Sequence, residues 1–337
     1  MIFREAQEKD DAQLTELFAK PMPGDLSLSF TRTPGYLESC ARFGPRRRVL
    51  SAVEGDEVLA LCSFFLWPYS VAGKRVEVWT VADFRALDRA AHRSVTGRGW
   101  KALRGLLEGR PAMISVVDDN PISGPLFAKR RRGWPELRPV ARLQTLMFPL
   151  LGEYQDEIGV VCPAAERLCE FLNGDERELA PHILPGHLGR VAPAPEDFLG
   201  VTDGAGLRAC GALWDPCRFR QTRVAGYRGF YASLRRWSQK LGLDVMPEPG
   251  SKVAVGFASF LRGEEEALER VARALCHRAR QRGLSFLVWG GDAREKSPFP
   301  RHWPRFTYPS TLYQLVWEGD DPLKVGEGPC GYEVAWL

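Results

Sequence analysis

The sequence lacks any apolar run long enough to cross a membrane. A spanning helix needs about 20 consecutive apolar residues, and no apolar stretch of this 337-residue chain reaches that length. The first residues, MIFREAQEKDD, carry acidic side chains where a secretory signal has a basic region followed by an apolar one. We therefore expect a cytoplasmic protein with no membrane partner.

Metal-site and disulfide spacings are also missing. The eight cysteines include no Cys-x-x-Cys pair, and no histidine stands at zinc-finger spacing from any of them. The five histidines show no metal-ligand spacing of their own. The sequence thus predicts reduced structural thiols and no metal site.

A strong charge of either sign is absent too. The net charge is +4, which does not indicate general nucleic-acid binding. Basic residues nevertheless cluster at 46–48 and at 129–132. Hydrophobic residues make up 45 % of the chain, enough for packed cores, and the length favours two domains.

Two halves of the chain repeat one order of patterns. The first half predicts a hairpin, a strand, a helix, a short strand and a closing strand at 49–65, 76–87, 99–109, 111–120 and 142–150. The second half repeats them at 198–214, 252–261, 264–283, 284–293 and 311–319. This duplication predicts a mixed α/β fold of two tandem domains, 1–151 and 152–337, with the boundary where polar residues and glycine interrupt the pattern.

A basic, glycine-containing loop precedes the helix of the first half. Residues 92–100 read HRSVTGRGW. Such a loop brings backbone N–H groups and the positive end of the helix together, which favours an anion such as pyrophosphate. A glycine pair before a helix is also compatible with a simple turn, so the loop alone leaves both interpretations open.

The first half resembles the GCN5-related N-acetyltransferases. The matching features are the opening strand and helix, the coenzyme A loop with one extra residue, and the motifs after the next strand: Phe3 to Ala6 with AQLTELF, Arg93 with Gly97 and Gly99, and Asn120, Leu126, Phe127 and Gly133-Trp134. With the repeat, the chain resembles the tandem subset of this superfamily. That resemblance implies a twisted, mostly antiparallel sheet flanked by helices in each half, with one half keeping the cofactor.

The resemblance also implies an acyl-CoA-dependent N-acyltransferase, which we expect to be an acetyltransferase. It would move an acyl group from acetyl-CoA or another acyl-CoA to a small-molecule or peptide amine, by direct attack on the thioester. Implied cofactor contacts are Val81, Ala82, Asp83, Arg93, Ser94, Val95, Thr96, Gly97, Arg98, Gly99, Trp100, Asn120 and Phe127.

A base must accept the proton that the attacking amine loses. The candidates are Glu77, Asp83, Asp118 and Asp119, which lie at or near the strands that flank the expected cleft. Each is equally compatible with an ion-paired surface carboxylate. Where many relatives have a tyrosine that protonates the departing thiolate, this chain has Phe127, which has no proton to donate.

The second half departs from the coenzyme A pattern. Three carboxylates, at 264–266, open its helix where a pyrophosphate would approach. They stabilise the helix dipole and repel phosphate, so this half is predicted to shape the acceptor pocket or to be structural.

An insert at 217–243 has no counterpart in the first half. Tyr227, Tyr231, Leu234 and Trp237 fall at helical spacing, with arginines nearby. This predicts an amphipathic helix whose aromatic stripe packs on a core. A role in an acceptor groove, on an acidic partner or on RNA is the alternative.

Two other functions remain open from the sequence. The basic runs are compatible with a tandem-fold transferase that takes an aminoacyl group from tRNA, and Phe127 with a non-catalytic binding protein. The acceptor, the acyl chain length and the oligomeric state are not encoded in any motif.

Overall fold

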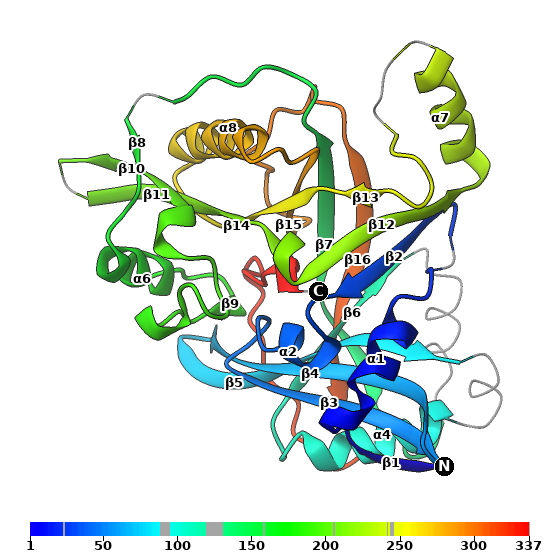
Figure 1. Ribbon diagram of the computed structural model, residues 1–337. Coiled ribbons are helices and arrows are strands. Elements are labelled where there is room, and N and C mark those ends of the chain that lie inside the picture. The colour runs from blue at the N-terminus through cyan, green and yellow to red at the C-terminus, as the bar shows by residue number, and fades with distance from the viewer. Residues whose placement is uncertain are drawn as a thin grey trace.

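One sheet of 13 strands runs through the whole molecule (Figure 1). The computed structural model describes residues 1–22, 24–87, 95–118, 131–157, 159–204, 206–240, 242 and 246–336. Within these ranges no helix combines the length and the apolar character needed to cross a bilayer.

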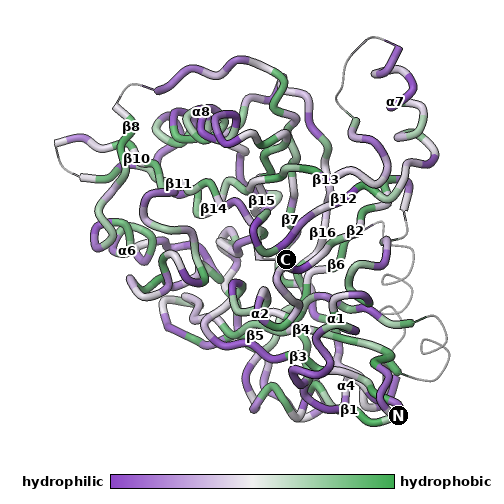
Figure 2. The backbone as a smooth tube through the Cα atoms, in the orientation of Figure 1, coloured by the Kyte–Doolittle hydropathy of each residue, from purple (hydrophilic) through white to green (hydrophobic). Residues whose placement is uncertain are grey.

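The elements of the first half follow the predicted order. They are β1 (Ile2–Glu5), α1 (Asp11–Phe18), β2 (Leu26–Arg32), α2 (Tyr36–Cys40), β3 (Arg46–Glu54), β4 (Glu57–Val71), β5 (Lys74–Ala86), α4 (Val95–Leu106), β6 (Ala112–Val117) and β7 (Glu136–Pro149). The predicted hairpin is β3 with β4, and β4 is apolar and buried along most of its length (Figure 2).

The second half repeats this order with additions. Its elements are β8 (Val160–Val161), α6 (Ala165–Asn173), β9 (Ala180–Pro181), β10 (Phe198–Asp203), β11 (Gly206–Trp214), β12 (Arg220–Tyr227), α7 (Gly229–Lys240), β13 (Lys252–Val253), β14 (Val255–Gly263), α8 (Glu265–Gln281), β15 (Phe286–Asp292) and β16 (Phe306–Val316). The mixed α/β fold with helices flanking a largely antiparallel sheet is confirmed.

The two closing strands are exchanged between the halves. The strand order is β1-β3-β4-β5-β6-β16-β7-β15-β14-β11-β10-β8. β16, from the second half, therefore lies between β6 and β7, and β7 pairs with β15. Only β5 with β6 and β14 with β15 pair in parallel within the described sheet.

Each half packs one long helix on its sheet. Trp100, Leu103 and Leu107 bring α4 onto β4, β5 and β6, while the apolar face of α8 covers the strands of the second half. A third core joins both halves and includes residues of α1, α2, α6 and the segment 330–336. The spacing of apolar residues along each helix thus fixes which side meets the sheet.

The insert at 217–243 differs from the prediction. Tyr227 is the last residue of β12, which pairs with β2 of the first half in a small separate sheet with β13. The helix begins only at Gly229, and the Trp237 side chain is 66 % exposed rather than packed on a core. Tyr227 lies in a strand although its spacing is helical, because pairing with β2 stabilises the extended conformation. The local sequence pattern holds no information about such a distant partner strand.

A buried hydrogen bond links the C-terminal segment to the first half. The hydroxyl groups of Tyr332 and Thr80 lie 2.6 Å apart. We expect Tyr332→Phe to lower the free energy of unfolding by about 1–2 kcal/mol, because it leaves the Thr80 hydroxyl without this partner. Urea unfolding measures the difference. Tyr313→Phe, at a half-buried ring, is the control, and equal losses in both variants would contradict the assignment.

Candidate functional site

β5 and β6 run side by side for three residues and then separate. Residues 79–81 of β5 pair with 112–114 of β6. Beyond Val81, β5 stays paired with β4, and β6 stays paired with β16. Within the described residues the two strands thus face each other with unpaired edges, 82–86 and 115–117. Free backbone N–H and C=O groups along such edges can bind an extended ligand.

A β-bulge lies where β5 turns away from β6. Asp83 and Phe84 both lie opposite Cys62 of β4, and Asp83 has a φ of +58°. Aspartate is one of the few residues besides glycine that tolerate this left-handed conformation. Because a bulge bends its strand, it accounts for the opening beyond Val81.

Three side chains hold the Asp83 carboxylate. Its Oδ2 accepts hydrogen bonds from Arg32 (2.8 Å), the Tyr36 hydroxyl (2.9 Å) and the Ser63 hydroxyl (2.8 Å). Burial alone would raise the pKa of Asp83, but the Arg32 charge and the bonds from Ser63 and Tyr36 hold it below its usual value. The carboxylate is therefore ionised and anchors the bulge to β2, α2 and β4.

Further arginines lie around this carboxylate. Arg220 of β12 lies directly across from Arg32 of β2, and burial together with the Arg32 charge lowers the pKa of Arg220 to about 10. Burial also lowers the pKa of Arg85, which follows the bulge, although Asp83 acts in the opposite direction. The point where the two halves meet is thus strongly basic for a buried region.

The described N-terminal part of α4 lies beside the same opening. It runs from Val95, ahead of the predicted helix start at Gly99, and residues 88–94 before it lie outside the described ranges. The first N–H groups of a helix have no partner within it. Arg98 is exposed and donates to the Met1 carbonyl (2.9 Å). The buried Trp100 ring packs on Phe84 of the bulge, 5.4 Å between centroids.

The candidate bases that the structure describes lie apart from one another. Glu77 precedes the paired stretch of β5, at the far end from the opening, and is half exposed and ion-paired with Arg110 (2.9 Å). Asp118 follows β6, where it accepts from Thr311 (2.9 Å) and pairs with Arg142 (3.0 Å) beside a groove of about 460 Å³. Of the three, only Asp83 lies at the bulge.

Several predicted residues lie outside the described ranges. They are Arg93 and Ser94 ahead of α4, the candidate base Asp119, and Asn120 and Phe127. The side chain of Thr96 is also outside them. Within the described residues no cluster of three or more His, Cys, Asp or Glu side chains is placed to hold a metal ion. All eight cysteines are unpaired thiols.

The second half contains the same opening. β14 and β15 pair in parallel through Ala258 and Trp289 and then separate. Phe260 of β14 lies in a bulge opposite Gly211 of β11, with a φ of +55°. Both halves therefore contain a bulge next to two parallel strands that separate.

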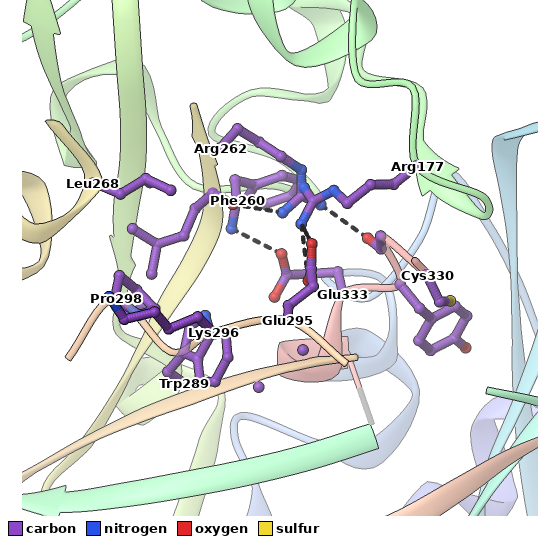
Figure 3. Close-up of a pocket in the computed structure, with 16 residues that line it drawn as sticks. Arg177, Phe260, Arg262, Leu268, Trp289, Glu295, Lys296, Pro298, Cys330 and Glu333 are labelled. Carbon is purple, nitrogen blue, oxygen red and sulfur yellow. Dashed lines mark hydrogen bonds and ion pairs between the residues drawn. The ribbon is translucent and has the colours of Figure 1, made fainter. Parts of the chain in front are cut away.

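In this second opening, however, the segment 330–336 fills the space. The Glu333 Oε2 accepts the Phe260 N–H at 2.8 Å (Figure 3). Val334 packs against Gly290, where a Cβ atom would come within 2.5 Å of it. Burial raises the pKa of Glu333 to about 7. The chain itself thus provides the acceptor for the N–H of this bulge.

The space that remains beside Glu333 is small. It is a cavity of about 60 Å³ whose lining includes Arg177, Arg262 and Glu295 (Figure 3). Arg177 pairs with Glu295 at 2.9 Å. This volume holds one or two water molecules. The predicted acidic run is itself ion-paired, Glu264 with Arg208 and Glu265 with Lys296, so the segment 330–336 is the principal obstacle to a ligand.

Sequence reasoning missed the residues that shape both openings. Arg32, Tyr36 and Ser63 converge on Asp83 from three different elements, and Glu333 reaches Phe260 across 73 residues. No local motif marks any of them. The repeated strand–helix–strand pattern locates the strands that carry the bulges, but it indicates neither the bulges nor the side chains that gather around them.

The basic run at 46–48 is only partly neutralised. Arg46 and Arg48 share one carboxylate, that of Glu108 just after α4, and Glu108 also pairs with Arg110. In the second run, Arg131 lies over the Trp134 ring at 4.9 Å, and residues 129 and 130 lie outside the described ranges. The tRNA-dependent alternative therefore stays a prediction.

Comparison with solved structures identifies proteins of similar fold. No protein-family model and no curated protein matches the sequence. Among solved structures, the N-myristoyltransferase of Saccharomyces cerevisiae with bound myristoyl-CoA matches with a TM-score of 0.64 at 10 % identity, over 98 % of this chain and 88 % of that one. A conserved Enterococcus faecalis protein of unknown function, described as a probable N-acyltransferase, matches with a TM-score of 0.51 at 7 % identity, over 94 % and 72 %. The chain has the tandem GCN5-related N-acetyltransferase fold of the N-myristoyltransferases.

Proposed function

We propose that this protein is an acyl-CoA-dependent N-acyltransferase with a single acyl-CoA site between β5 and β6. The observation that carries the proposal is the contrast between the two openings. The second is filled by residues 330–336, whereas within the described residues the first keeps unpaired strand edges at 82–86 and 115–117. A duplicated fold in which only one of the two openings is available would bind one acyl-CoA per chain.

The residues at the first opening fit an acyl-CoA. The free edge of β5 at Val81 to Asp83 suits the amide groups of a pantetheine arm. The positive N-terminal end of α4 suits the pyrophosphate. Arg93, Ser94, Asn120 and Phe127 stay predicted contacts.

The backbone N–H at the Asp83 bulge is our candidate for stabilising the reacting carbonyl group. In the second half the N–H of Phe260 reaches an acceptor inside the opening. Asp83 occupies the same bulge position, and no described side chain accepts from its N–H, so we expect this N–H to polarise the acyl carbonyl. The Asp83 side chain acts as a positioning group, because its low pKa and its three hydrogen bonds disfavour proton uptake.

The reaction is a direct transfer. The amine nitrogen attacks the thioester carbon, a C–N bond forms, the C–S bond breaks, and coenzyme A leaves as the thiolate. The ammonium proton passes to a base, for which Glu77, Asp118 and Asp119 remain candidates. The acceptor is a small-molecule or peptide amine. The sequence resemblance favours an acetyl group, while the similar solved yeast enzyme holds myristoyl-CoA.

Isothermal titration with acetyl-CoA and with myristoyl-CoA tests the site. We expect one equivalent per chain for at least one thioester. Arg98→Glu should raise its dissociation constant at least about tenfold, because a negative charge in the first turn of α4 opposes a pyrophosphate. Lys252→Glu is the matched control, an exposed charge reversal on β13 of the separate small sheet, and should change binding less than about threefold. Failure of every thioester to bind would refute the proposal.

A further inference from the structure

Helix α7 stands away from the body of the molecule (Figure 1). It follows β12, and its inner side approaches the start of β16, where the Tyr231 and Phe306 rings lie 6.1 Å apart. Phe230 is 70 % and Trp237 66 % exposed, which places them among the most exposed large apolar side chains of the described residues. Exposing two aromatic rings to water is unfavourable unless a partner covers them.

Both rings lie on one face of α7. Seven residues separate Phe230 from Trp237, which is nearly two turns of a helix. Leu234 lies between these rings on the same stripe and is half-buried, whereas Lys240 and Arg236 are exposed next to the rings, on the side away from Leu234. The exposed face is therefore a pair of aromatic rings with cations along one side.

The charge of this insert has one sign. Residues 216–243 contain seven basic residues and no acidic one. Two described carboxylates contact the helix: Glu248 pairs with Arg235 (3.6 Å), and Asp25 lies beside Gly229. Within the described residues, no ion pair joins Arg228, Arg236 or Lys240 to a carboxylate, and all three are exposed. The exposed face thus complements an anionic surface.

We propose that α7 docks this protein on an anionic phospholipid surface. Phe230 and Trp237 enter the boundary between headgroups and acyl chains, and Arg228, Arg236 and Lys240 contact lipid phosphates. Tryptophan suits this boundary because its ring is apolar and its N–H is polar. This contact is peripheral, goes beyond the proposed transferase activity, and departs from the expectation that the chain has no membrane partner.

A lipid surface fits the shape of this face better than RNA does. Proteins that bind single-stranded nucleic acid usually hold it in a basic groove with the bases stacked on a platform. α7 instead presents a convex ridge with its two rings about 10 Å apart along the axis. A ridge of this kind inserts into a deformable layer without needing a complementary groove.

Vesicle co-sedimentation tests the proposal with the full chain. We expect binding to vesicles with about one third phosphatidylserine in phosphatidylcholine, weaker binding as salt rises, and little binding to phosphatidylcholine alone. The double variant Phe230→Ser, Trp237→Ser should lower the partition coefficient at least about tenfold. Arg236→Gln with Lys240→Gln should lower it and weaken its salt dependence. Leu151→Ser, which removes a 58 % exposed apolar side chain elsewhere, should leave it unchanged.

Two results would overturn the proposal. One is vesicle binding that is absent at low salt, or equal in the wild type and the Phe230 and Trp237 double variant. The other is binding of a fluorescent tRNA that the double variant loses while vesicles are not bound, which would assign the ridge to RNA. Because neither assay uses a thioester, both are independent of whether acyl-CoA binds.

Discussion

Asp83→Ala is expected to lower the free energy of unfolding by about 3–5 kcal/mol and to abolish acyl transfer. The substitution leaves the buried Arg32 guanidinium without its carboxylate and removes the acceptor of three hydrogen bonds. Breaking a buried ion pair from one side costs about this much, because the remaining charge is uncompensated. Urea unfolding gives the loss in stability, and thioester turnover gives the loss in activity.

Two further variants separate the sources of this effect. Asp83→Asn keeps the size of the side chain and one acceptor oxygen, so it isolates the contribution of the charge. Asp320→Ala removes a carboxylate that pairs with the exposed Arg104 and accepts the Trp317 N–H (3.3 Å), and should cost only about 1 kcal/mol. If Asp83→Ala were no more costly than Asp320→Ala, the anchoring role of Asp83 would be wrong.

Glu333→Gln is expected to change how stability depends on pH. Burial raises the pKa of Glu333 from 4.5 to about 7 in the folded protein. Between these values the folded state binds the proton more tightly than the unfolded state. The Glu333 contribution to stability is therefore fully present below pH 4.5 and is lost as pH rises through 7, by at most about 3 kcal/mol. Because glutamine does not ionise, the Glu333→Gln variant should be more stable than the wild type above pH 7.

Urea unfolding of both proteins at pH 5, 6, 7 and 8 checks this prediction. The difference between the two proteins is the quantity to compare, because His187 acts in the opposite direction. Burial lowers the pKa of His187 to about 4, so its contribution is lost as pH falls. Glu264→Gln, an exposed and ion-paired carboxylate, is the control. Parallel pH profiles for the wild type and Glu333→Gln would contradict a buried proton on Glu333.

The order of elements could be predicted from the sequence, but the exchange of the closing strands could not. Alternating apolar residues at 142–150 and 311–319 identify two strands, as β7 and β16 confirm. Nothing in either pattern specifies the neighbouring strand, because alternation marks the buried face of a strand but not the strand that lies beside it. The boundary between 151 and 152 stays a prediction, since the sheet continues across both halves.

The site could be predicted only as far as local sequence reaches. Strand 76–87 and the helix after it locate the opening, because both are periodic over many residues. The left-handed bulges at Asp83 and Phe260 escape detection, since neither residue is glycine and one bulged residue leaves no period. The filling of the second opening by residues 330–336 is equally invisible, because it depends on contacts such as that of Glu333 with Phe260, 73 residues away.

The exchanged strand also has a consequence for how the chain is synthesised. β6 gains its second neighbour only when β16 emerges, since Val117 pairs with Ser310, 193 residues later. Until then, a ribosome-bound first half exposes the edge of β6 on the side that β16 will cover. Exposed strand edges recruit other strands, and long-range pairing is slow. The nascent first half should therefore be a chaperone client whose release coincides with the completion of β16.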